Sequence, residues 1–218
     1  MFGGFGLVQI IHIIALFIAL DVHEFCHAWM ADELGDPTPR YMGRLSLDPR
    51  VHLDPLGTLM IIVSSLSGFG FGWGKPVRVN PYNLRYGPRV GLGMVAFAGP
   101  LANLFTASLM AVPIRLGLPL PWVIVLILKA IVVVNIGLAV FNLIPLPPLD
   151  GFSVLMGVLS TIRAPWAYRW SYTLSQYEAQ GPMLLLLLIM LDWFLPIGIF
   201  DLIIGPPFYL LRRLILGS

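Results

Sequence analysis

Long apolar stretches separated by short polar loops dominate this chain. The four clearest stretches cover residues 5–30, 55–71, 90–112 and 122–143. A helix of about 20 apolar residues crosses the hydrocarbon core of a bilayer, so the first, third and fourth stretches predict membrane-spanning helices. The second stretch is shorter and rich in Gly and Ser, which makes it a poor lipid-facing helix.

The last third of the chain has a less regular pattern. Residues 183–204 are long enough to span a bilayer, although Asp192 and Pro196 interrupt them. Residues 163–180 mix aromatic, charged and polar side chains, a composition suited to the membrane interface. We therefore predict an all-α polytopic membrane protein with four to six membrane helices.

Composition supports a membrane protein. The chain is 58% hydrophobic and 11% charged, whereas soluble domains carry about 25% charged residues. The longest polar stretches, residues 32–54 and 72–89, are too short to be independent domains, so we expect one membrane-embedded domain over residues 1–218. The net charge of +2 does not favour a nucleic-acid partner, and the single cysteine, Cys26, excludes an intrachain disulfide. A cleaved signal peptide is not expected, because the first apolar stretch carries the motif described next.

The first apolar stretch contains an H-E-x-x-H motif, from His23 through Glu24 to His27. Positions i and i+4 share one face of a helix, so both imidazoles can reach one metal ion. Glu24 directly follows the first histidine, where zinc peptidases keep the carboxylate that activates water. Because the motif lies in a predicted membrane helix, it indicates hydrolysis within the bilayer.

Catalytic zinc usually takes three protein ligands, so a third donor is required. Glu33 lies six residues after His27, about 240° around a continuing helix, and faces away. Donors available in the loop that follows, and later in the chain, are Asp48, His52, Asp54 and Asp150. We favour Asp150, because three prolines unwind the chain before it, and irregular backbone at membrane depth is tolerated only inside protein or along a watery cavity.

Together with residues 99–103 (Gly-Pro-Leu-Ala-Asn) and 142–151 (N-x-x-P-x-P-x-x-D-G), the H-E-x-x-H motif resembles the site-2 proteases, zinc peptidases that cut within the membrane. The resemblance covers about residues 5–155, the expected catalytic core, and leaves C-terminal helices at about residues 156–218. The chain is similar to the small forms without a PDZ domain, since no insertion is long enough to hold one.

The resemblance implies a role for each matching residue. His23, His27 and Asp150 are expected to bind one Zn²⁺, and Glu24 to act as general base and acid. Asn142 is expected near the active site, where it positions substrate or stabilises the oxyanion. The implied substrate is a transmembrane protein in the lipid bilayer, and a homo-oligomer is compatible with the sequence.

A parity argument predicts the topology. Asp150 can meet the histidines only if the fourth apolar stretch ends toward the same side as the first. The loops 32–54 and 72–89 then share that side, and residues 55–71 must be re-entrant. Most basic residues fall in these two loops, which makes this side cytoplasmic and places His23 roughly 10 Å below its surface. The predicted localisation is the cell membrane, with the active site toward the cytoplasm.

Candidate substrate contacts are Trp73, Val77, Val79 and Asn103. Residues 73–79 alternate with period two, which predicts a short membrane-associated β-strand or hairpin that receives substrate by edge addition. Asn103 lies in a stripe of small residues, so helix packing is the alternative role for it.

Two other functions compete with an intramembrane peptidase. A membrane metal-ion transporter also places His and Asp within the membrane, but it is expected to spread such ligands through both halves, whereas here they cluster in one. A catalytically inactive scaffold is the third class, and the complete set of motif residues argues against it.

Overall fold

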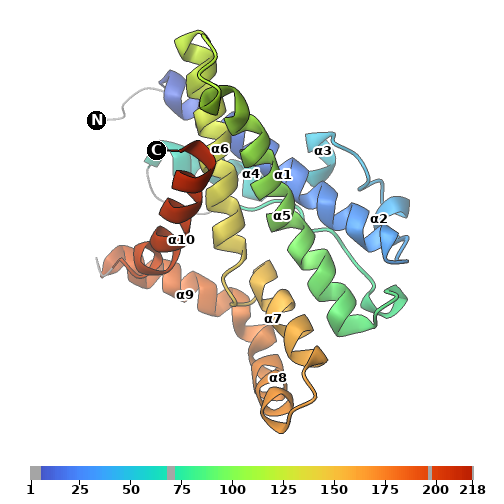
Figure 1. The fold of residues 1–218 in the computed structure, drawn as a ribbon. Coiled ribbons are helices and arrows are strands. Elements are labelled where there is room, and N and C mark those ends of the chain that lie inside the picture. The colour runs from blue at the N-terminus through green and yellow to red at the C-terminus, as the bar shows by residue number, and fades with distance from the viewer. Residues whose placement is uncertain (1–5, 68–71, 196–197, 218) are drawn as a thin grey trace.

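The computed structural model describes residues 6–67, 72–195 and 198–217, which form an assembly of helices (Figure 1). Its helices are α1 (Leu7–Glu33), α2 (Thr38–Tyr41), α3 (Pro49–His52), α4 (Pro55–Ser67), α5 (Pro88–Arg115), α6 (Trp122–Asn142), α7 (Asp150–Thr161), α8 (Pro165–Tyr177), α9 (Gly181–Phe194) and α10 (Ile199–Leu216), with 3-10 turns η1 (Pro81–Asn83) and η2 (Glu178–Gln180). Residues 68–71, at the end of the second predicted stretch, and Pro196 lie outside the described residues.

Helix α5 is the centre of the assembly and contacts α1, α6 and α7. It forms a helical hairpin with α6, and α7 folds back along the first half of α5 (Figure 1). Glycines allow this close approach, because a Cβ on Gly157 would lie 3.2 Å from the Cα of Gly93. The Asp150 end of α7 is thereby brought toward α1.

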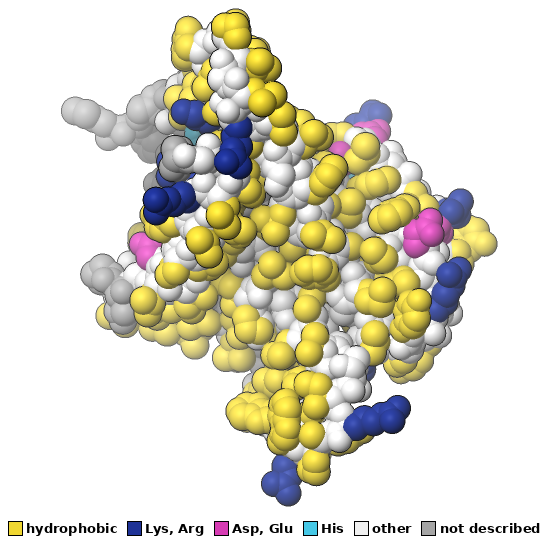
Figure 2. Space-filling model, in the orientation of Figure 1, with side chains coloured by type: hydrophobic (Ala, Val, Ile, Leu, Met, Phe, Trp, Pro, Cys, Tyr) yellow, Lys and Arg dark blue, Asp and Glu magenta, His cyan; other side chains and the backbone are white. Residues whose placement is uncertain are grey.

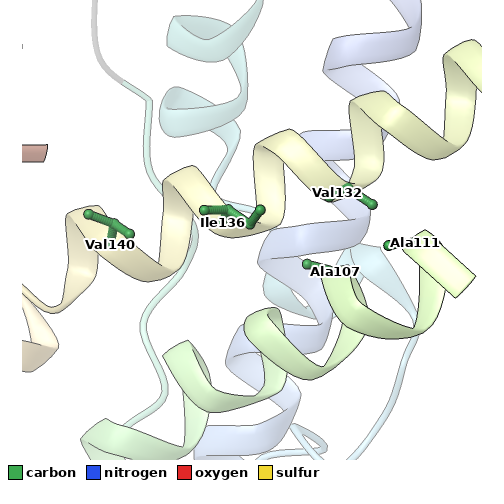
Figure 3. Close-up of a cluster of buried hydrophobic side chains, with 5 residues drawn as sticks. All are labelled: Ala107, Ala111, Val132, Ile136 and Val140. Carbon is green, nitrogen blue, oxygen red and sulfur yellow. The ribbon is translucent and has the colours of Figure 1, made fainter. Parts of the chain in front are cut away.

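An apolar cluster joins α5 to α6. Its members are Ala107 and Ala111 on α5 and Val132, Ile136 and Val140 on α6, which face each other in Figure 3. Partly buried side chains of α10 pack against the same cluster. Small residues on α5 let the larger side chains of α6 fit closely, which suits helix packing in a membrane.

The all-α, multi-pass prediction is confirmed. Four helical stretches are long and apolar enough to cross a membrane: α1, α5, α6 and the continuous run Pro165–Phe194, formed by α8, η2 and α9. Figure 2 shows hydrophobic side chains across most of one face, with Lys and Arg gathered toward its edges.

Residues 183–204, which are long enough to span a bilayer, do not form one continuous helix. Helix α9 ends at Phe194, and α10 begins at Ile199. Gly198 between them has φ 68°, a left-handed conformation that glycine adopts without a steric penalty. The carboxylate of Asp192 accepts a hydrogen bond from the backbone N–H of Ile199, so the residue that interrupts the apolar pattern stabilises the break.

Residues 72–80, which precede η1, follow an extended path but do not belong to a sheet (Figure 1). Leu53 and Gly74 form an antiparallel bridge, which is isolated among the described residues. Gly57 on α4 permits this arrangement, since a Cβ there would lie 2.0 Å from the carbonyl oxygen of Trp73. The predicted β-strand or hairpin is therefore not confirmed, since residues 72–80 contain this one bridge and no ladder of pairs.

Asp36 anchors the far end of this segment against the end of α1. Its fully buried carboxylate accepts hydrogen bonds from the hydroxyl and N–H of Thr38, from Asn80 N–H and from the Asn83 side chain. Burial raises the pKa of Asp36, but these hydrogen bonds outweigh it and hold the pKa below its ordinary value. The extended segment is thus fixed at both ends, beside the motif of α1.

Candidate metal centre

Three donor atoms from two distant parts of the chain converge beside α5. The Nε2 atoms of His23 and His27 lie 3.0 Å apart. Asp150 Oδ2 lies 3.1 Å from the first and 3.3 Å from the second. Among the described residues, these three side chains are the only group of His, Cys, Asp or Glu whose ligand atoms all lie within 4.8 Å of one another.

Gly99 makes room for both imidazoles between α1 and α5. A Cβ at this position would lie 2.5 Å from His27 Nε2 and 2.7 Å from His23 Cε1. Any larger residue would therefore have to displace both rings. The glycine of the Gly99-Pro100 pair is explained by this close approach of α5 to the motif.

The two histidines are oriented by different acceptors. His27 Nδ1 lies 2.7 Å from the carbonyl oxygen of Val95, and His23 Nδ1 lies 2.7 Å from Asn103 Oδ1. Because an oxygen of either kind only accepts, each Nδ1 carries the proton. Each Nε2 consequently presents its lone pair toward Asp150.

Asn103 is fully buried behind His23 and does not line the cavity described below. Its Nδ2 donates to the carbonyl oxygen of Ala19, at 2.9 Å, and to Asn135 Oδ1, at 2.8 Å. The structure thus places Asn103 against a candidate ligand and between three helices, which agrees with the packing role considered from the sequence. Sequence analysis missed Asn135, although an asparagine inside the apolar run between Lys129 and Asn142 was a usable signal.

The proline-rich loop between α6 and α7 carries Asp150 to the histidines. Helix α6 ends at Asn142, and α7 begins with Asp150 itself. Gly151 is required at this turn, because a Cβ there would lie 2.2 Å from the carbonyl oxygen of Leu143. The unwound backbone therefore folds back tightly and holds the carboxylate at the depth of the motif.

The donor set fits a divalent cation such as Zn²⁺. Two imidazole lone pairs and a carboxylate oxygen face each other within 3.0–3.3 Å, and such acceptors repel unless a cation or protons lie between them. Ligands held tetrahedrally at about 2.0–2.1 Å from zinc lie roughly 3.3 Å apart, close to the observed spacing. Asp150 Oδ2 is buried and has no hydrogen-bond donor among the described residues.

Glu24 and Asn142 share a cavity of about 320 Å³ with the three donors. Val77 and Val79 of the extended segment also line it, whereas Trp73 does not. Glu24 Oε2 accepts a hydrogen bond from the backbone N–H of Val77 at 3.2 Å. A half-buried carboxylate is therefore held in the same cavity as the donor atoms.

The other candidate third ligands lie elsewhere. Asp48 caps α3 by accepting a hydrogen bond from the N–H of Arg50, and Asp54 accepts one from Gly57 N–H at the start of α4. His52 is buried and lies 3.9 Å from Asp21 Oδ1. These residues hold the loop in place and do not join the group at the motif.

Comparison with known proteins points in one direction. The family model "Peptidase family M50" matches residues 118–187, which include α6, the proline-rich loop, Asp150 and α7. The "Putative zinc metalloprotease YwhC" of Bacillus subtilis (strain 168) is 34% identical over 157 residues, 66% of this chain and 66% of that protein. The chain belongs to peptidase family M50. This membership confirms the resemblance to site-2 proteases.

The chain covers a smaller share of a second relative. The "Putative zinc metalloprotease Rip2" of Mycobacterium tuberculosis (strain ATCC 25618 / H37Rv) is 33% identical over 142 residues, 63% of this chain and 53% of that protein. The chain thus spans about two thirds of YwhC and half of Rip2. Neither name points to a metal transporter. No solved structure matches the chain significantly.

Proposed function

We propose that this chain is a zinc-dependent endopeptidase that cuts transmembrane proteins within the bilayer. The observation that carries the proposal is the convergence of His23, His27 and Asp150 beside the cavity that Glu24 lines. Membership of the M50 family and the names of the two relatives support it. We propose one domain, with a catalytic core at about residues 5–155 and C-terminal helices at 156–218.

The three donors would hold Zn²⁺, which when bound polarises the scissile carbonyl and acidifies water. The Glu24 carboxylate takes a proton from the attacking water and returns it to the leaving amine. Asn142 lines the same cavity, and one N–H of its carboxamide donates to the carbonyl oxygen of Leu138. Its second N–H is available for the substrate carbonyl as negative charge develops there.

Substrate binding by edge addition to the extended segment is supported by its position along the cavity. Val77 and Val79 line the cavity, and the segment is already extended. The N–H groups of Lys75 and Val77 are used, donating to His52 and Glu24. A substrate strand would therefore pair along the opposite edge, where alternation places Gly74 and Arg78.

We propose that α4 is re-entrant and that the site opens toward the cytoplasmic side of the cell membrane. The bridge between Leu53 and Gly74 keeps both ends of the α4 excursion together, as a dip into the bilayer requires. Glu178, which follows α8, lies 3.8 Å from Arg89 and places α8 on the side of the basic loops. That side then carries Arg40, Arg44, Arg50, Lys75, Arg78, Arg85, Arg89, Arg163 and Arg169.

Fewer basic residues lie at the opposite end of the helices. Arg115 at the end of α5 donates to the carbonyl oxygen of Leu214, so the end of α10, with Arg212 and Arg213, lies beside it. Lys129 near the start of α6 completes this smaller set. The excess on the side of the basic loops supports a cytoplasmic orientation of the site by the positive-inside rule.

The decisive experiment replaces Glu24 by Gln in protein reconstituted with a transmembrane substrate. Cleavage should fall by about 10²–10⁴-fold, because the proton-transferring carboxylate is lost, while the zinc content persists. Glu33→Gln is the matched control, since Glu33 is exposed at the end of the same helix, and it should cleave normally. Metal analysis of Asp150→Ala should show loss of zinc. Full cleavage by Glu24→Gln, or zinc retained by Asp150→Ala, contradicts the proposal.

A further inference from the structure

We propose that Asn135 is a positioning residue of the metal site, which acts on His23 through Asn103. The inference rests on the proposed function, because it assigns the device that keeps one zinc ligand in its binding tautomer. It concerns a residue on α6 that touches neither the cavity nor the three donors. The contacts form one line from α6 through α5 to α1.

A carboxamide behind a histidine can support either tautomer. If Asn103 presents Oδ1, the proton is on His23 Nδ1 and the lone pair is on Nε2. If the group rotates by 180°, its NH₂ faces Nδ1 and favours the proton on Nε2, which removes the ligand atom. The two ends of the side chain have nearly the same shape, so packing alone does not choose between them.

Two acceptors on Nδ2 make the choice. Asn103 Nδ2 donates to Ala19 O and to Asn135 Oδ1, and both acceptors are oxygens that cannot donate. Rotation of the carboxamide would place Oδ1 against two other oxygens. The site is fully buried, since Asn103 and Asn135 are each 0% exposed, so no water can replace the lost bonds.

Asn135 is itself held in one orientation. Its Nδ2 donates to the carbonyl oxygen of Ile131 at 2.8 Å, one turn earlier on α6. Its Oδ1 is therefore fixed toward Asn103. The series of hydrogen bonds behind His23 therefore ends on a backbone carbonyl oxygen, as the single hydrogen bond of His27 to Val95 does. The difference is that His23 depends on two intervening side chains.

The first test measures zinc affinity by chelator competition in purified Asn135→Val and Asn135→Thr. These variants have the same shape and differ in one hydroxyl. Thr can donate to the carbonyl one turn earlier and accept from Asn103, whereas Val can do neither. Zinc affinity should fall about 10-fold in Asn135→Val and recover at least partly in Asn135→Thr. Wild-type affinity in Asn135→Val, or equal affinities in the two variants, overturns the proposal.

The second test is a double-mutant cycle with Asn103→Val. Alone, this variant should lose about 10–100-fold in zinc affinity. If Asn135 acts only through Asn103, adding Asn135→Val should cost nothing further, because no carboxamide remains to orient. The visible spectrum of the Co²⁺-loaded protein should likewise be the same in Asn103→Val and in the double variant. Losses in affinity that add across the two positions overturn the relay.

Two controls separate the possible failures. Ser108→Ala removes an exposed side chain of α5 that donates to Leu104 O, and it should not change zinc affinity. His23→Ala should abolish tight zinc binding. If His23→Ala binds zinc normally, the proposed function fails. If His23→Ala loses zinc and Asn135→Val does not, only the relay fails.

Discussion

The helices around the site and the C-terminal helices are both rich in apolar residues, but they differ in burial. In the most apolar stretches of α1, α5 and α6, 33–44% of the residues are buried, against 11% in the run formed by α8 and α9. Helix α10 contains no buried residue. Few apolar residues of the C-terminal helices are therefore buried inside the protein, and one side of α10 packs against the α5–α6 cluster.

Buried polar groups follow the same division. The buried polar or charged side chains of the described residues are Asp21, His23, His27, Asp36, Arg44, His52, Asn103 and Asn135. All of them precede α7. Lipid tails are as apolar as leucine, so apolar surface alone does not drive helices together in a bilayer, and small residues and polar contacts decide which helices pack. The helices that pack closely are therefore the ones that carry the polar network of the site.

The largest expected effect comes from a single methyl group placed in the packed region. Gly99→Ala would push both imidazoles off α5, and displacement of a ligand by about 1 Å costs on the order of 100-fold in rate. Cleavage of a reconstituted substrate should fall at least that far, with loss of zinc. The matched change Gly205→Ala on α10 should have no effect, since the nearest atom to its Cβ would be 3.6 Å away. Equal cleavage by Gly99→Ala and Gly205→Ala would contradict the expected difference between the two regions.

Truncation of apolar side chains tests the contrast in stability. Ile136→Ala empties space in the α5–α6 cluster and should lower the free energy of unfolding in detergent by about 2–5 kcal/mol. Leu202→Ala removes a side chain on α10 that is 77% exposed, and it should change stability by less than about 0.5 kcal/mol. A large loss in Leu202→Ala would show that the exposed side of α10 is also packed against protein in solution.

A contact between α9 and the proline-rich loop sets the smallest effect. Gly181, at the start of α9, lies against the proline-rich loop, and a Cβ there would be 2.2 Å from Pro147 Cβ. Gly181→Ala should shift this loop and lower kcat/KM about 10-fold through Asp150. Gly137→Ala, with its nearest atom 3.9 Å away, should leave kcat/KM unchanged. An unaffected Gly181→Ala would show that the contact with α9 does not position the proline-rich loop.

The local signals in the sequence were sufficient for the helices α1, α5 and α6 and for the group of three donors. H-E-x-x-H fixes two side chains on one helix face, and three prolines before Asp150 identify an unwound stretch at membrane depth. Both signals depend only on neighbours along the chain. The turn at Gly198 was not predicted, because Pro196 alone does not tell a kink from a complete break.

Contacts between helices that are far apart in the chain could not be predicted from the sequence. The acceptor for His27 is the backbone of Val95, and every residue has such a carbonyl, so no side chain marks it. Asn103 was assigned to helix packing or to substrate binding, because no residue near it in the sequence shows that its side chain contacts His23. Burial by lipid and burial by protein also favour the same apolar residues, so the low burial of α8 to α10 inside the protein could not be predicted.

The carbonyl of Val95 has a consequence for how the site tolerates sequence change. Every amino acid at position 95 supplies the same acceptor, so apolar replacements there preserve the setting of His27 as long as α5 keeps its place. In the proposed relay, positions 103 and 135 have less freedom, because position 103 needs a carboxamide facing one way and position 135 needs a side chain that presents an acceptor to it. The two imidazoles therefore differ in robustness to mutational drift: one relies on the main chain common to all proteins, the other on two particular residues.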